Sequence, residues 1–348
     1  MDEYRAELAP RPFGLNNTGV ICYFNAFLQT LAGCTAFTRG VLLNADFLRR
    51  TATGAAIIDY VAAYTAARGG ALEAGEPAAG IELRSSAVLR ALVGDLAARR
   101  PNVRFGGGQE SASEALIHLL DMMEPPRPAG APLAGGAAES PITSLFQHRF
   151  RCDIHCRRCR AVVSKTTDFA VNFNLFHLDH LRAPPADAAA FSKAVRLQAE
   201  AIDDYRCPAC PCAACGGRPG EAAACAGCGA PVPAAKAYRV YNLTMVPEII
   251  YAMFNLYVGY GGNRRARFFP ERLEFPARDG GLLIFRLVGQ VEHAGALSGG
   301  HYWARGLRAG GRSYLLNDTG VTPAPFAATP GTYIVVYHYA GREPPPAA

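Results

Sequence analysis

Apolar residues recur at helical spacing in the first third of the chain. Intervals of three and four residues are typical of a helix that buries one face. This spacing predicts a helix that starts near Cys22 and further helices over 42–64, 81–98 and 111–123. Segments rich in Gly, Ala and Pro follow the helices expected over 42–64 and 111–123, and these segments predict loops over 68–80 and 125–141. In the first helix the apolar face is made by Phe24, Phe27, Leu28 and Leu31.

The pattern changes to short alternating or continuous apolar runs farther along the chain. Residues 145–152 and 162–175 alternate as half-buried strands do, and from Tyr238 onward the chain is a series of such runs. These later runs predict an antiparallel sheet. Helices at one end and strands at the other indicate the α+β class.

Length and composition limit the class of protein. The chain has 348 residues, half of them hydrophobic, so it can bury a large core. No apolar run approaches the roughly 20 residues of a membrane span, and the first residues lack the apolar segment of a signal peptide. The net charge of +6 permits an acidic partner surface without requiring nucleic acid.

Eight of the eleven cysteines form four C-x-x-C pairs. Such pairs are typical of zinc ligands, two from each pair, so four pairs suffice for two ions. Zinc binding requires reduced cysteines rather than disulfides. The pairs therefore predict a reducing, intracellular compartment, cytoplasmic or nuclear. The paired residues are Cys156, Cys159, Cys207, Cys210, Cys212, Cys215, Cys225 and Cys228.

Cys22 lies where a loop becomes a helix, and this position favours a thiolate. Asn17 lies five residues earlier, where its amide could reach an oxyanion beside Cys22. Taken alone, a buried structural cysteine explains the position equally well, because free Cys is among the most buried residue types.

Four stretches together resemble the ubiquitin-specific proteases, papain-like cysteine enzymes that remove ubiquitin. The first, 14–31, has the form G-L-x-N-x-G-x-x-C-Y-x-N-x-x-L-Q, with Ile21 where the family has Thr. The others are Q-E-S-A-S-E-A-L-I-H-L-L-D at 109–121, H-A-G-A-L-S-G-G-H-Y-W-A at 293–304 and Y-L-L-N-D-T-G-V-T-P at 314–323. Their joint occurrence in family order is far more specific than any single motif.

The resemblance implies a single catalytic domain of three parts. A helical thumb would cover 1–141, zinc-bearing β fingers 142–255 and an antiparallel β palm 256–348. Within the fingers, 179–199 resembles the connecting helices of the family, and 207–228 could be an inserted zinc ribbon.

The resemblance also implies the roles of the site residues. Cys22 would be the nucleophile, His301 its base, and Asn317 the group that orients the imidazole, with Asp318 beside it. Asn17 and the Cys22 backbone N–H would bind the oxyanion. The wall of the channel for the substrate tail would be made by Gly299, Gly300 and Tyr302.

Two pairings of the cysteine pairs are open. In one, Cys156 and Cys159 join Cys207 and Cys210, as in the family's Y-x-C-x-x-C element, and 212–228 forms a self-contained ribbon. In the other, Cys225 and Cys228 join Cys156 and Cys159, because Cys228 stands at the family's usual distance from Ala234-Ala235-Lys236. We favour the first. In the family this zinc is structural.

The expected activity is hydrolysis of the isopeptide or peptide bond after the C-terminal Gly-Gly of ubiquitin, through a thioester. Ubiquitin or ubiquitinated proteins are the expected partners, with no membrane, and the chain is expected to act as a monomer. Alternatives are a protease for another ubiquitin-like modifier, or a weakly active ubiquitin-binding module whose zinc ribbon binds a partner. The segment 207–228 has only Arg218 as a basic residue after its first Cys, which argues against nucleic acid.

Overall fold

The computed structural model describes residues 11–66, 84–108, 110–126, 141–166, 173–174, 185–217, 224–231, 234–258, 261–262, 266–277, 279–296 and 299–344. The loop expected over 68–80 and most of that expected over 125–141 lie outside these residues. The chain forms two compact units. The first contains Met1–Gln147, Val171–Phe176 and Pro247–Ala348, and the second His148–Ala170 and His177–Val246.

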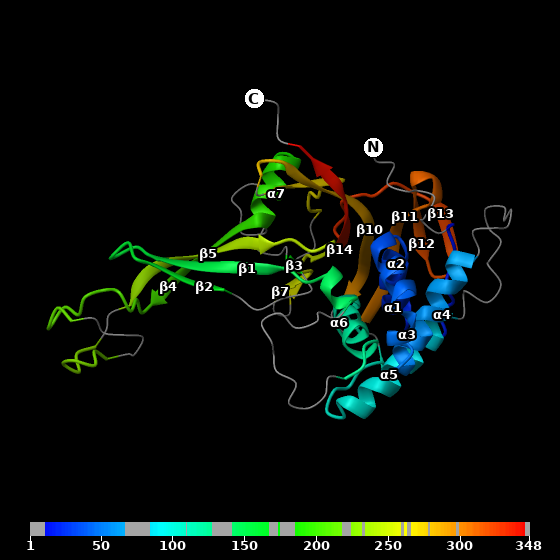
Figure 1. Cartoon of the computed structure of the whole chain (residues 1–348), viewed down its shortest axis with the longest axis horizontal. Coiled ribbons are helices and arrows are strands. Elements are labelled where there is room, and N and C mark those ends of the chain that lie inside the picture. Colours follow the sequence, from blue (N-terminus) through cyan, green and yellow to red (C-terminus); the bar gives the residue numbers. More distant parts are fainter. Residues whose placement is uncertain are drawn as a thin grey trace. The chain divides into compact units, whose positions relative to one another are not determined.

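Helices make up the N-terminal part of the first unit (Figure 1). The helices expected near Cys22, over 81–98 and over 111–123 are confirmed within the described residues. The α-helices are α1 Cys22–Ala32, α2 Thr35–Leu43, α3 Ala45–Leu48, α4 Ala52–Ala66, α5 Arg84–Arg99 and α6 Ala112–Met122, and the 3₁₀ helix η2 is Thr143–Leu145.

The single helix expected over 42–64 is wrong, because polar residues end and restart it. The Asn44 side chain donates to the Gly40 carbonyl at 2.8 Å, where α2 ends. Before α4, the Thr51 hydroxyl accepts from the Gly54 N–H at 2.8 Å, as an N-cap does. These caps interrupt an otherwise continuous apolar pattern.

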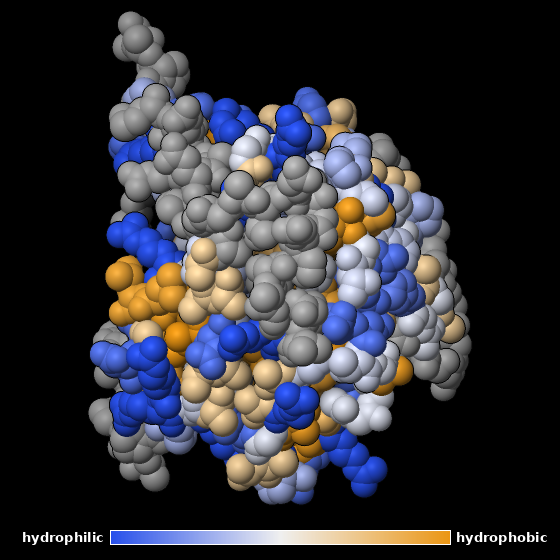
Figure 2. All heavy atoms as spheres, turned by 90° about the vertical axis from the view of Figure 1, so that its right-hand side faces the viewer, coloured by the Kyte–Doolittle hydropathy of each residue, from blue (hydrophilic) through white to orange (hydrophobic). Residues whose placement is uncertain are grey.

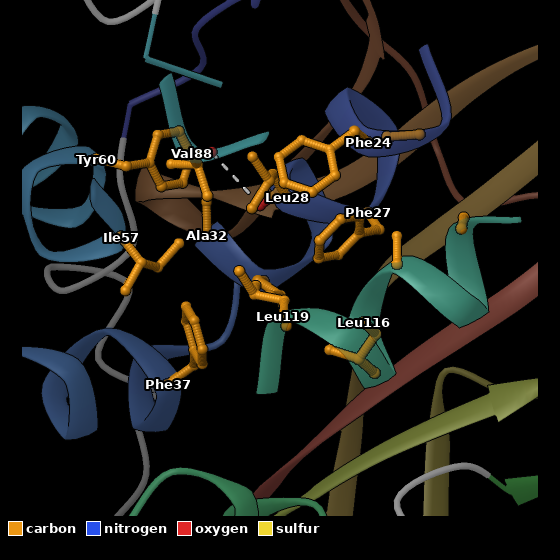
Figure 3. Packing of buried hydrophobic residues seen from close by; sticks show 14 of the residues in the cluster. Phe24, Phe27, Leu28, Ala32, Phe37, Ile57, Tyr60, Val88, Leu116 and Leu119 are labelled. Atoms are coloured by element: carbon orange, nitrogen blue, oxygen red, sulfur yellow. Dashed lines mark hydrogen bonds between the residues drawn. The ribbon is translucent and has the colours of Figure 1, made fainter. Parts of the chain in front are cut away.

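The helical core surrounds α1, all of whose residues are buried. Phe24 and Phe27 lie edge to face at 4.9 Å between ring centroids. Figure 3 shows Leu116 and Leu119 of α6 on one side of α1 and Ile57 and Tyr60 of α4 on the other. The Tyr60 hydroxyl donates to the Leu28 carbonyl at 3.5 Å. An edge-to-face pair such as Phe24 and Phe27 stabilises the core by more than the burial of its apolar area alone.

An eight-stranded sheet forms the rest of the first unit (Figure 1). Its order is β13-β12-β11-β10-β14-β6-β3, with β9 also paired to β10. All described pairs are antiparallel except β3 with β6, so an antiparallel sheet and the α+β class are confirmed. The first run expected in this sheet, which begins at Tyr238, belongs instead to the sheet of the second unit. The strands are β3 Phe173–Asn174, β6 Ile249–Met253, β9 Arg272–Pro276, β10 Leu282–Ala296, β11 Gly299–Arg308, β12 Arg312–Asn317, β13 Gly320–Pro323 and β14 Thr332–Glu343; η4 Ala309–Gly311 is a 3₁₀ turn, and β7 Tyr257–Val258 pairs separately with β8 Gly261–Gly262.

The helix α1 packs on strands β10 and β11 of this sheet. A buried arginine fixes the contact: the Arg308 guanidinium of β11 donates to the backbone carbonyl of Gln29 at 3.0 Å and to its side-chain oxygen at 2.5 Å. Gln29 in turn donates to the Phe13 carbonyl at 2.7 Å. The segment before Cys22, the helix that follows it and the His301 strand are therefore linked by buried hydrogen bonds.

The second unit holds a four-stranded antiparallel sheet of order β2-β1-β5-β4. Its elements are β1 Arg149–Cys156, β2 Val162–Thr166, α7 Ala188–Arg196, β4 Leu197–Tyr205 and β5 Ala235–Met245. Of the connecting helices expected over 179–199, the described residues contain only α7. The residues after it pair with β5, although their Ala, Gln and Glu favour helix, because tertiary pairing overrides local propensity.

Exposed large apolar residues are few among those described, with Leu43, Val20 and Val162 the most exposed. On the face shown in Figure 2, small orange groups are interspersed with hydrophilic residues. Within the described residues no single helix is long and apolar enough for a membrane span. Only α1 and α2 taken together are, and they meet at an angle of 88°.

Candidate active site and cysteine clusters

Cys22 is the first residue of α1 and is only 4% exposed. The loop before it is fixed by Asn17, whose side-chain oxygen accepts from the Ile21 N–H at 3.2 Å. The thiol lies against β11, where the backbone N–H of Tyr302 donates to it. The residue after His301 thus contacts the sulfur.

Burial is the largest influence on the Cys22 thiol, and it raises the pKa of that group. Backbone N–H groups of Tyr302, Tyr23 and Cys22 itself act in the opposite direction, and the Asp318 carboxylate raises the pKa further. The balance leaves the pKa above its ordinary value. A thiol of this kind is protonated at neutral pH, so its chemistry requires a base.

His301 and Asn317 come together from neighbouring strands. The Nε2 atom of His301, on β11, lies 2.6 Å from the side-chain oxygen Oδ1 of Asn317, at the end of β12. An amide oxygen can only accept, so in this arrangement Nε2 carries the proton and Nδ1 has the lone pair. That is the tautomer in which Nδ1 acts as the base.

Asp318 follows in the tight turn between β12 and β13, at a positive φ of 49° that Asp tolerates. Its Oδ2 atom lies 4.0 Å from Nε2 of His301, too far for a hydrogen bond. The carboxylate instead accepts from Asn17 Nδ2 at 3.1 Å and from Asn25 Nδ2 at 2.9 Å. Asp318 therefore binds the Cys22 loop and helix directly.

The backbone of the loop before Cys22 also contacts the backbone of the β12–β13 turn. The Leu15 N–H donates to the Asp318 carbonyl at 2.8 Å. A Cβ on Gly14 would lie 2.5 Å from the Thr319 carbonyl oxygen, so only Gly permits this approach. The expected oxyanion donor Asn17 is exposed. Its amide has two N–H bonds, and the contact with Asp318 uses one.

The residues expected to line the channel occupy β11. Gly299 begins the strand, and a Cβ on Gly300 would lie 2.2 Å from the Ala294 carbonyl oxygen, which explains the Gly. The Tyr302 ring is buried and packs on His293 with centroids 4.2 Å apart. Its side chain therefore points to the opposite face of the strand from His301.

Sequence reasoning missed Asn25, which is 2% exposed. Besides its bond to Asp318, its amide nitrogen donates to the Asn16 carbonyl at 3.2 Å. The signal was present: Asn25 and Gln29 are polar residues four apart on a helix that is otherwise mostly apolar. Buried polar residues at such spacing indicate a specific partner.

The eight paired cysteines gather in two groups in the second unit. One group is Cys156, Cys159, Cys207 and Cys210, and the other is Cys212, Cys215, Cys225 and Cys228. This is the first of the two pairings considered from the sequence. Cys34 is a buried core residue, and Cys152 is buried outside both groups.

The geometry of both groups suits a tetrahedral metal. Neighbouring sulfurs lie 3.6 Å apart for Cys156 with Cys210 and 3.7 Å apart for Cys215 with Cys225. Disulfide sulfurs are only about 2 Å apart, whereas ligands of one zinc ion at about 2.3 Å are about 3.8 Å from each other. Each group can therefore hold a zinc ion.

Comparison with known proteins gives a family match. The sequence profile described as ubiquitin carboxyl-terminal hydrolase matches residues 13–337. No curated protein sequence matches the chain.

Solved structures share the fold. The SAGA DUB module Ubp8/Sgf11/Sus1/Sgf73 bound to monoubiquitin matches with a TM-score of 0.66 and 16% identity, over 96% of this chain and 70% of that one. The same module bound to ubiquitin aldehyde matches with a TM-score of 0.65 and 18% identity, over 96% of this chain and 71% of that one. A yeast SAGA DUB module with an Sgf73 mutant matches with a TM-score of 0.65 and 17% identity, over 96% of this chain and 70% of that one. Since the profile spans all four motif stretches and nearly the whole chain, this protein belongs to the ubiquitin carboxyl-terminal hydrolase family.

Proposed function

We propose that this chain performs the family's deubiquitinase chemistry with Cys22 as nucleophile, His301 as base and Asn317 as the orienting group. The observation that carries the assignment is the 2.6 Å contact between His301 Nε2 and Asn317 Oδ1. The backbone N–H of Tyr302, the residue after His301, donates to the Cys22 sulfur. Together these contacts support the assignment of His301 as the base for the buried Cys22 thiol, because Tyr302 directly follows His301 on β11.

In the first step His301 Nδ1 removes the Cys22 proton, and the sulfur attacks the carbonyl of the last glycine of ubiquitin. The oxyanion that forms takes hydrogen bonds from Asn17 and the Cys22 backbone N–H. His301 then protonates the leaving amine, which is a lysine side chain or a peptide N-terminus. Water, activated by the same imidazole, hydrolyses the thioester and frees the thiol.

Gly299 and Gly300 support a narrow channel for the substrate tail. The close approach of Gly300 to Ala294 leaves no room for a side chain. The proposed channel would admit a tail that ends in Gly-Gly and would exclude bulkier tails.

Zinc has a structural role in this proposal. A Cys₄ group has no open position for substrate, which is the mark of a structural zinc site. The first cluster would join the end of β1 and the turn after it to the segment after β4, and the second would join Cys212 and Cys215 to Cys225 and Cys228.

Ubiquitin and its conjugates are the proposed partners, in a reducing compartment of the cell. Two of the similar solved structures hold ubiquitin or ubiquitin aldehyde, and also Sgf11, Sus1 and Sgf73 beside Ubp8. We propose that the present chain hydrolyses a ubiquitin C-terminal amide as a monomer, which sedimentation of the active protein would test.

The experiment for the function is hydrolysis of a fluorogenic ubiquitin C-terminal amide. The wild-type chain should turn it over, and Cys22→Ser should be inactive with an unchanged melting temperature. The matched control is Cys34→Ser, a buried cysteine of the same unit outside the site, which should retain activity if folded. Full activity in folded Cys22→Ser would refute the assignment.

A further inference from the structure

The chain's single tryptophan stands beside the proposed base. Trp303 and His301 are two residues apart on β11, so both side chains project from the same face of the sheet. Their rings are nearly parallel, at 28°, with centroids 6.0 Å apart. This separation is within the range of aromatic stacking.

A buried carboxylate holds the indole in this orientation. Glu292 lies opposite Trp303 on β10, is 1% exposed, and accepts from the indole Nε1–H at 2.9 Å. The same oxygen accepts from Arg305 Nε at 2.8 Å. The other oxygen accepts from the Thr329 hydroxyl at 2.6 Å. Both oxygens are bonded, so the carboxylate can be buried and fixed.

We propose that Trp303, held by Glu292, is a positioning residue that keeps the His301 imidazole in the plane required by both Cys22 and Asn317. The His301 side chain is half-exposed, and its hydrogen bond to Asn317 alone does not prevent rotation of the ring about that bond. A neighbouring indole face restricts this rotation. It also attracts the imidazolium that forms when Cys22 loses its proton, as an aromatic face attracts a cation.

The charged and titratable groups around the pair come from four elements. They are Asp318 from the β12–β13 turn, Glu292 from β10, Arg305 from β11 and Cys22 from α1. Glu292 is shared with Arg305, so its charge is partly balanced, and the role assigned to it is to orient the indole.

The test separates orientation from general stability, and one of its two readouts, Cys22 alkylation, does not require ubiquitin. The rate of Cys22 alkylation by iodoacetamide, read from the Cys22 peptide by mass spectrometry, is measured from pH 5 to 10 together with the kcat and KM for a ubiquitin amide. In Trp303→Leu we expect kcat and the alkylation rate at pH 7 to fall about three- to tenfold with KM unchanged. Trp303→Phe, which retains a ring, should recover most of the loss.

Glu292→Gln should fall between wild type and Trp303→Leu, because the amide keeps an acceptor for the indole but binds Arg305 less well. Fluorescence gives an independent readout, since Trp303 is the only tryptophan. A protonated imidazole quenches a neighbouring indole, so emission should fall on acidification in wild type, and this fall should be absent in His301→Gln.

Two results would overturn the inference: a folded Trp303→Leu variant with the wild-type kcat and alkylation profile, or emission whose pH dependence is the same in His301→Gln. This inference rests on the proposed role of His301, yet its failure is distinguishable from failure of that function. A Cys22 alkylation profile that depends on Trp303 in a protein inactive on ubiquitin would support the positioning role and refute only the substrate.

Discussion

The Asn17 side chain donates to Asp318 across the site, with Nδ2 and Oδ2 3.1 Å apart. Asn25 donates to the other carboxylate oxygen at 2.9 Å. Asp318 therefore bonds to the residues that shape the oxyanion site and lies 4.0 Å from the His301 ring nitrogen. Its main effect on catalysis is expected through Asn17, with a smaller electrostatic effect on the imidazolium.

A double-mutant cycle tests this coupling. Asn17→Ala should lower kcat by roughly 10²–10³-fold with little change in ubiquitin binding, as for one lost oxyanion donor. Asp318→Ala should lower kcat through the misplaced Asn17 amide, and the double variant should be little worse than Asn17→Ala alone. Additive losses would instead show that the two residues act independently.

Asn317 is the residue proposed to orient the His301 imidazole, whereas Asp318 lies too far from the ring for a hydrogen bond. Asn317→Ala removes the side-chain oxygen that accepts from His301 Nε2, so kcat should fall by roughly 10²-fold or more while KM is retained. Asn317→Asp is the matched variant: a carboxylate there accepts the same hydrogen and stabilises the imidazolium, so much of the rate should remain. The measurement is the steady-state kcat and KM of both variants. A wild-type kcat in Asn317→Ala would assign the orienting role to Asp318 instead.

The sequence predicted the catalytic elements because their chemistry is local. Turn residues followed by helical spacing located Cys22 at a loop-to-helix boundary, where the structure has it. The same holds for the sheet that carries His301 and Asn317. The breaks around α3 were missed because single polar caps, Asn44 and Thr51, decide them inside an apolar run.

The contacts across the site were not predictable, because they join distant residues. Nothing local in the sequence indicates that Asn25 would bond to a carboxylate 293 positions away, or that Glu292 would hold Trp303. The strand β4 was missed for a similar reason: its residues favour helix, and pairing with β5 determines their conformation. Long-range pairing of this kind becomes visible only in the folded chain.

Zinc content is a direct prediction from the two cysteine clusters. Metal analysis of purified protein should give close to two zinc ions per chain. Cys212→Ser with Cys215→Ser should lower this to one and leave the first cluster loaded, because no sulfur is shared between the groups. A strong chelator should lower the melting temperature, since metal binding is coupled to folding. A wild-type content of one ion would contradict the separate ribbon.

His338 makes stability depend on pH. Burial lowers the pKa of His338 to about 4, and its Nε2 accepts from the Ala36 N–H at 3.3 Å. The unfolded chain binds the proton near pH 6.5, so stability is full above that pH and is lost as the pH falls towards 4. At pH 5.5 the loss is about 1 kcal/mol. Urea unfolding at pH 7.5 and 5.5 should show it.

The matched variant is His338→Gln, which has no titrating ring. Its free energy of unfolding should change between the two pH values by about 1 kcal/mol less than that of wild type. Acid release of zinc affects both proteins alike, so the difference between them isolates His338. Equal changes in the two proteins would contradict the prediction.

The most direct measurement for the central claim is the covalent reaction of the chain with ubiquitin carrying a C-terminal electrophile. Intact mass followed by peptide mapping locates the bond among eleven cysteines. We expect one ubiquitin per chain, attached at Cys22, in a reaction that proceeds in wild type and is strongly slowed in His301→Gln. Attachment at another cysteine, or labelling that proceeds equally in His301→Gln, would contradict it.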